Sequence, residues 1–194
     1  MRYVLVSLVG DSATQSNDQF ARWFAERHVP VRAFHEEHPD HTSVQGAVED
    51  AGTAIVMGHD GGGSLRARAA GPPWATAEDF ATMFSGARVW AFACSTRSAQ
   101  LEDDLDSFGR KVRGGGVAVF AGHASDITAP PLFDSLPLLR DQTYGALARG
   151  FRKFLQGSNS AKEIRNHALR SSGRGTALVA RSIEDTFQTL RILA

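Results

Sequence analysis

The sequence predicts an α/β fold in which helices cover both faces of a mostly parallel sheet. Short, continuous apolar runs rich in Val, Ile and Phe occur at residues 3–9, 54–57, 89–93 and 117–121. Such runs are typical of strands that are buried on both faces. Segments with the spacing of amphipathic helices lie between them. Strands that alternate with helices predict right-handed crossovers between parallel strands, and therefore a three-layer sandwich.

Two weaker strand candidates, residues 31–34 and 176–180, bring the predicted sheet to six strands.

The predicted helices are marked by apolar spacing and by start signals. Residues 76–79 have the form of a capping box, and residues 160–163 repeat it before a helix that we expect to run through Leu169. Apolar residues spaced three and four apart predict further helices over 101–112 and 147–155. The glycines at 114–116 are expected to stop the first of these.

Length and composition describe an ordinary globular protein. We expect residues 1–194 to form a single domain, because 194 residues is a typical domain size and the sequence has no repeat or long linker. The apolar run at 3–9 is too short for a secretory signal or a membrane helix, so no membrane partner is expected. A single cysteine excludes an intrachain disulfide and suits a reducing cytoplasm. A composition rich in Ala, Arg and Gly favours a bacterial source.

The zero net charge of the chain hides an asymmetry. Residues 1–139 carry a net charge of −6 and residues 140–194 a net charge of +6. Complementary surfaces within the protein explain this pattern, and a basic face for an acidic partner is the alternative. No aromatic residues are interleaved in a basic stretch, so nucleic acid is not expected as a partner.

Polar residues follow each strong strand candidate. Asp11 follows the first strand, His59 the next, Cys94 the one after it, and His123 and Asp126 the last. Because sites in parallel sheets gather at the carboxyl ends of the strands, these residues are expected at one edge.

A cysteine and a histidine at the ends of neighbouring strands are suited to nucleophilic catalysis. A thiol with an ordinary pKa of ~8.5 is only a few per cent thiolate at neutral pH. Proton transfer to an imidazole raises that fraction, and the imidazolium can then protonate the leaving amine. Backbone N–H groups of Cys94 and of the turn at Asp60 and Gly61 would hold the oxyanion.

Four segments resemble the caspase-like cysteine peptidases, and most closely the CHAT branch that is related to separase. They are Val-Met-Gly-His59, Ala-Phe-Ala-Cys94-Ser-Thr, the Gly-Gly-Val-Ala-Val-Phe-Ala-Gly of residues 115–122, and residues 154–165 at a helix start. The resemblance covers roughly residues 53–170. It implies a caspase-like fold and cysteine endopeptidase activity on a protein substrate, with Cys94 as nucleophile, His59 as general base and no metal or organic cofactor.

The resemblance also implies roles for acidic residues. In some members the aspartate after the fifth strand receives a basic P1 side chain, which corresponds to Asp126 here, and Asp11 would line the same pocket. The alternative is that each aspartate caps a turn or helix. The family usually has His-Gly, whereas this chain has His59-Asp60-Gly61. The oxyanion donor is then the Asp60 or the Gly61 amide, and an alternative role for Asp60 is to orient His59 or to bind a basic residue.

Two other functions stay open. A catalytically silent caspase-like module would act by protein binding, and an unrelated flavodoxin-like domain would bind a small molecule. Caspase-like domains are commonly inactive until cleavage or an activating protein partner orders their loops, and residues 126–139 are the candidate loop here.

Three further patterns in the sequence have simpler explanations. His35, His38 and His41 are spaced like metal ligands, but Pro39 prevents a helix that would place them on one face, so no metal site is expected. His123 competes with His59 for the role of base, and the family pattern favours His59. The sequence has no Gly-x-Ser-x-Gly elbow, which argues against a serine hydrolase.

Overall fold

The computed structural model describes residues 1–61, 63–95, 101–124, 127, 137–170 and 177–194, with the backbone alone for 94–95, 101–107, 138 and 178. In chain order the elements are β1 (Val4–Leu8), α1 (Ser12–Arg27), β2 (Arg32–Glu36), α2 (His41–Ala51), β3 (Thr53–Asp60), β4 (Ser64–Arg66), β5 (Ala75–Thr76), α3 (Ala77–Met83), β6 (Arg88–Ser95), α4 (Leu101–Gly114), β7 (Val119–His123), α5 (Pro137–Leu155), α6 (Ala161–Leu169), α7 (Ala177–Gln188) and β8 (Leu190–Leu193).

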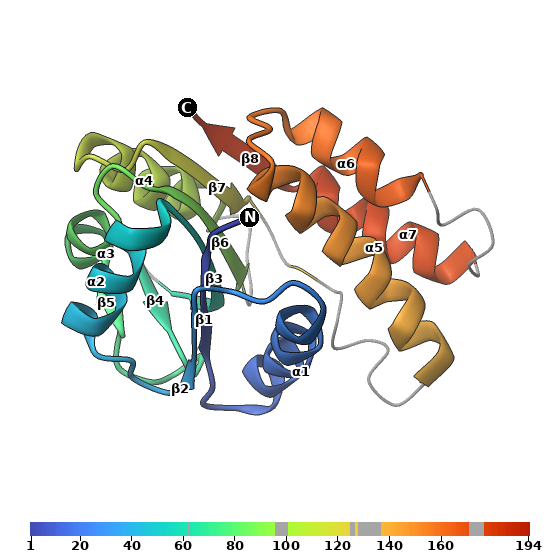
Figure 1. Cartoon of the computed structure of the whole chain (residues 1–194), viewed down its shortest axis with the longest axis horizontal. Helices are drawn as coiled ribbons and strands as arrows, with labels where there is room; N and C mark the ends of the chain where they lie inside the picture. The colour runs from blue at the N-terminus through green and yellow to red at the C-terminus, as the bar shows by residue number, and fades with distance from the viewer. Residues whose placement is uncertain (62, 96–100, 125–126, 128–136, 171–176) are drawn as a thin grey trace.

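One mixed, mostly parallel sheet forms the centre of the described structure (Figure 1). Its main strands lie in the order β2-β1-β3-β6-β7-β8, and the first five of these are parallel to one another. The edge strand β8 runs antiparallel to β7, and the short strands β4 and β5 extend β3 as antiparallel additions. The predicted α/β class with a mostly parallel sheet is confirmed.

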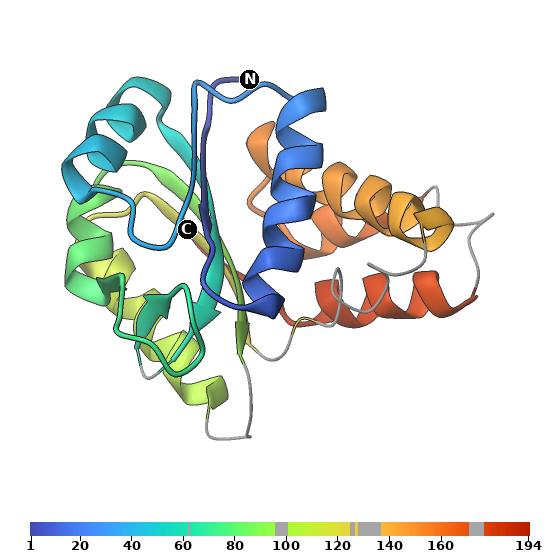
Figure 2. The ribbon, with the colours of Figure 1, turned by 90° about the horizontal axis from the view of Figure 1, so that it is seen from below.

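Helices cover both faces of the sheet, so the fold has three layers. Figure 2 shows α2, α3 and α4 on one side of the strands and α1, α5, α6 and α7 on the other. The central strands β1, β3, β6 and β7 supply both layers, because their side chains alternate between the faces. In β3, Ile55 and Met57 pack towards α1 and α5, whereas Ala54 and Val56 pack towards α2 and α3. This double burial is the reason that the strands read as continuous apolar runs.

The sheet corrects one predicted strand. Residues 176–180 were expected to be a strand, but α7 begins at Ala177. Val179, Ile183 and Phe187 are buried at four-residue intervals, and this helical period outweighs the local content of β-branched residues. The sixth strand of the main path is instead β8, a four-residue segment whose length gives little periodic signal.

The helix starts follow the expected chemistry. Thr76 and Asp79 form the predicted capping box at α3. Ser160 caps α6 by accepting from the Glu163 amide at 3.2 Å, but the Glu163 carboxylate binds Lys153 at 2.7 Å, so the second half of the predicted box is replaced by an ion pair. The helix α4 ends at Gly114, close to Gly116 with its positive φ of 112°.

None of the helices in the described ranges has both the length and the apolar character needed to cross a membrane.

Candidate active site at the carboxyl ends of the strands

The pairing of β3 with β6 brings two of the predicted site residues into register. His59 is the parallel partner of Cys94, and Asp60 is the partner of Ser95. Neighbouring strands lie about 4.8 Å apart, so the backbones of His59 and Cys94 are adjacent. The side chain of Cys94 lies outside the part of the chain that the structure describes.

The imidazole of His59 is almost completely buried, with 2% of the side chain exposed. Its Nε2 atom lies 3.0 and 2.9 Å from the two carboxylate oxygens of Asp11. Its Nδ1 atom has no hydrogen-bond partner among the side chains and backbone atoms that the structure describes. One nitrogen of the ring is therefore held by a carboxylate, while the other is left for a group outside the described atoms.

Asp11 is fixed by the start of α1. It is the N-cap of this helix: its carboxylate accepts from the Thr14 amide at 3.1 Å, and the Thr14 hydroxyl accepts from the Asp11 amide at 3.0 Å. The amide of Ala69 donates a third hydrogen bond, to Oδ2 at 3.1 Å. Partial burial alone would raise the pKa of Asp11, but the hydrogen bonds from His59, Thr14 and Ala69 outweigh it and lower the pKa to about 2. Asp11 is therefore an anion at neutral pH.

The segment after β4 packs closely against this site. The Thr14 hydroxyl donates to the carbonyl of Ala67 at 2.9 Å, which ties the start of α1 to that segment. Gly10 permits the approach, because a Cβ atom there would lie 2.8 Å from the same carbonyl oxygen. A larger residue at position 10 would displace either Asp11 or the segment that carries Ala69.

The two predicted oxyanion residues have other contacts in this structure. The Gly61 amide donates to the carbonyl of Ser64 at 3.0 Å, closing the turn between β3 and β4. That hydrogen bond would have to break before Gly61 could serve an oxyanion. Asp60 is paired with β6 on one side and with β4 on the other, and its side chain is buried. Because side chains alternate along a strand, the side chain of Asp60 lies on the sheet face opposite to that of His59. Asp60 therefore does not orient His59, and Asp11 lies in the place where an orienting carboxylate is needed.

His123 has a structural role that uses both ring nitrogens. Nε2 accepts from the Trp90 indole at 3.1 Å, and Nδ1 lies 3.1 Å from the Thr186 carbonyl and 3.0 Å from the Thr189 hydroxyl. Complete burial lowers the pKa of His123 to about 3. This neutral, fully bonded histidine is not available as a base.

The histidines with the spacing of metal ligands contact different partners. His35 Nδ1 contacts Asp18 at 2.6 Å, and His41 Nε2 contacts the Trp74 carbonyl at 2.8 Å. Over the described residues, no three His, Cys, Asp or Glu side chains gather as a metal site would require.

Two predictions fall on residues outside the described ranges. These are Asp126, with its role towards a basic P1 side chain, and most of the loop 126–139. Both stay predictions.

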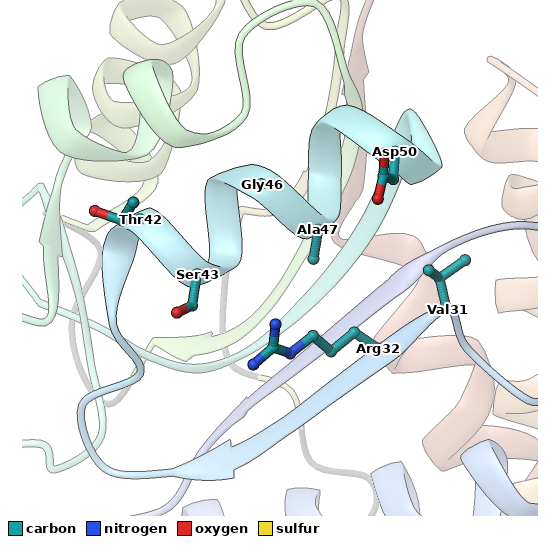
Figure 3. A pocket seen from close by; sticks show the side chains of 7 residues that line it. All are labelled: Val31, Arg32, Thr42, Ser43, Gly46, Ala47 and Asp50. Atoms are coloured by element: carbon teal, nitrogen blue, oxygen red, sulfur yellow. The ribbon is translucent and has the colours of Figure 1, made fainter.

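Two shallow hollows lie away from the predicted site residues. One, of about 260 Å³, lies between the edge strand β2 and helix α2, and Figure 3 shows Arg32 extending across it; it is lined by Val31, Arg32, Thr42, Ser43, Gly46, Ala47 and Asp50. The other, of about 420 Å³, lies between α3 and α4 and is lined by Ala77, Glu78, Ala81, Thr82, Lys111 and Gly115. Neither contains a group of the arrangement around His59.

The contact between Asp11 and His59 is the feature that sequence reasoning missed. Both residues are predicted at the same edge, with substrate binding as the role of Asp11 and helix capping as the alternative; the structure confirms the capping. The missing information was the strand order. Because β1 lies directly beside β3, the residue that caps the helix after β1 lies next to the carboxyl end of β3.

Comparisons of this chain with family models, with curated proteins and with solved structures give no match, so the candidate site is defined by the geometry above.

Proposed function

We propose that this protein is a caspase-like cysteine endopeptidase with Cys94 as nucleophile and His59 as general base. One observation carries the proposal: the register of β3 and β6 places the only cysteine of the chain beside a buried histidine whose Nδ1 has no partner among the described atoms. A buried imidazole nitrogen without a partner is costly, and a thiol at the adjacent strand position would satisfy it.

The proposed reaction begins with transfer of the thiol proton from Cys94 to Nδ1 of His59. The thiolate attacks the carbonyl carbon of the scissile peptide bond, and a tetrahedral intermediate forms. The imidazolium returns the proton to the leaving amine, which leaves a thioester on Cys94. His59 then accepts a proton from water as the water attacks the thioester carbonyl. The C–S bond breaks, the carboxylic acid product leaves, and the imidazolium returns the proton to Sγ of Cys94.

The substrate is a protein or peptide, and the family resemblance favours a basic P1 residue held by Asp126. No metal or organic cofactor takes part in this scheme. The single free cysteine supports the cytoplasm as the place of action, where thiols stay reduced. An activating protein partner is part of the proposal.

Labelling by peptidyl acyloxymethyl ketones tests the proposal. These probes carry a peptide recognised by the enzyme and an electrophile that traps the nucleophile. We expect one adduct at Cys94 by mass spectrometry, formed faster with Arg than with Leu or Asp at P1. His59→Ala should slow the labelling at least about 100-fold, the range that general base catalysis supplies.

The matched control is His38→Ala, which removes a histidine with 48% of its side chain exposed and should label like the wild type. Labelling of the folded protein no faster than that of the urea-unfolded chain would contradict the proposal. Such a result would favour the silent module that acts by protein binding.

A further inference from the structure

The carboxylate of Asp11 has the position and the charge of a third member of the candidate site. It approaches His59 Nε2 with both oxygens, from the start of α1, on the side of the ring opposite to Nδ1. The family resemblance had suggested substrate binding for this residue, and the geometry points to a different role.

We propose that Asp11 is a positioning residue that holds His59 in the Nε2–H tautomer and so presents Nδ1 as the acceptor for the Cys94 thiol proton. An ionised carboxylate can only accept hydrogen bonds, so the hydrogen shared between the two groups resides on Nε2. In a neutral imidazole the other nitrogen is then the acceptor. This inference rests on the proposed function, because it assigns Asp11 a part in the same proton transfer.

The charge of Asp11 also stabilises the product of that transfer. When the thiol proton moves from Sγ to Nδ1, His59 becomes an imidazolium while its Nε2 proton stays in place. The adjacent carboxylate favours this cation, and the charge-assisted hydrogen bond becomes stronger. Asp11 itself gains no proton.

The hydrogen bonds around Asp11 make this position rigid and argue against substrate recognition. Besides His59, Oδ1 accepts from the Thr14 amide and Oδ2 from the Ala69 amide. A P1 guanidinium that paired with Asp11 would compete with these donors. A carboxylate held by one helix start and one loop amide, with 31% of its side chain exposed, is suited to orient an imidazole.

Asp11→Asn is the decisive variant. Asparagine is as good an N-cap as aspartate, so the helix start is retained while the charge is removed. We expect the apparent pKa of the Cys94 thiol to rise by about 1 unit, because the imidazolium that pairs with the thiolate loses the opposite charge that favours it. At neutral pH, alkylation of the thiol should slow by up to about 10-fold, in line with the smaller thiolate fraction. Asp11→Ala removes the acceptor as well, and should shift the His59 tautomer towards Nδ1–H in ¹⁵N NMR spectra of the ring.

The matched control is Asp40→Ala, which removes the N-cap carboxylate of α2, an exposed contact to the Ser43 amide. It should weaken a helix start in the same way but leave the thiol pKa and the His59 tautomer unchanged. A second readout separates positioning from P1 recognition. Asp11→Asn should slow labelling by Arg and Leu probes by the same factor, whereas loss confined to the Arg probe would overturn the inference.

Failure of this inference is distinguishable from failure of the proposed function. Two results would overturn the positioning role alone. One is an apparent thiol pKa that changes in His59→Ala but not in Asp11→Asn, and the other is a wild-type His59 in the Nδ1–H tautomer. An apparent thiol pKa that is the same in the wild type and in His59→Ala would overturn the proposed function, and the positioning role of Asp11 with it.

Discussion

Replacing Phe151 by alanine should lower the free energy of unfolding by about 3–5 kcal/mol, the range for deleting a large aromatic side chain from a core. Phe151 is fully buried in α5. Its ring lies 5.4 Å from Phe20, 5.7 Å from Phe24, 4.5 Å from Trp90 and 5.3 Å from Phe92, measured between centroids. Loss of this ring leaves a cavity where α1, α5 and β6 meet and removes its contacts with all three.

The effect is large beside a typical total stability of about 5–15 kcal/mol. Urea unfolding followed by circular dichroism measures it. Val29→Ala serves as the surface control, because that side chain is 78% exposed and its loss should change the stability by less than about 0.5 kcal/mol. A loss below about 1 kcal/mol in Phe151→Ala would contradict the packing of α5 on the sheet.

The free energy of unfolding should fall by about 2 kcal/mol between about pH 7 and about pH 5 through His123 alone. Burial lowers the pKa of His123 in the folded protein to about 3, while the unfolded chain has the ordinary value of ~6.5. As the pH falls through ~6.5, the unfolded state binds a proton that the folded state does not bind. Stability therefore decreases with falling pH, by up to about 1.4 kcal/mol per unit, until the folded pKa is reached.

The comparison of pH slopes isolates this histidine. Glutamine at position 123 cannot titrate. The free energy of unfolding of His123→Gln should therefore fall by about 2 kcal/mol less than that of the wild type between about pH 7 and about pH 5. The pKa values of His28 and His167 are also lowered, by partial burial first and by neighbouring cations second, and their contribution is common to both proteins. An identical pH slope in wild type and variant would show that His123 is not buried as a neutral ring.

The strong strands were predictable because each of them packs against helices on both faces, so nearly all of its residues are apolar. Ala54–Met57, Val89–Ala93 and the other continuous runs are buried on both faces, which leaves a signal that needs no knowledge of neighbours. The strand β8 and the hairpin strands β4 and β5 were missed for the opposite reason. They are two to four residues long, and their pairing partners rather than their own composition determine them.

The candidate site was predictable to the level of the sheet edge and no further. That His59 follows one strand and Cys94 the next could be read from the apolar runs, and the observed register places the two side by side. The contact of Asp11 with His59 depends on the strand order and on where α1 begins relative to β3. A local sequence pattern does not contain that information. The sequence favoured His59 over His123 as the base, but it could not show what holds His123. Its partners, the Trp90 indole and the Thr186 carbonyl, come from distant segments.

Alkylation of Cys94 by iodoacetamide as a function of pH, in the wild type and in His59→Ala, tests the pairing of these two residues most directly. The chain has one cysteine, so the mass increase reports that thiol without background from a second one. We predict an apparent pKa at least about 1 unit below the ordinary ~8.5 in the wild type, and a return to about 8.5 in His59→Ala. The same pKa in both proteins would contradict the account.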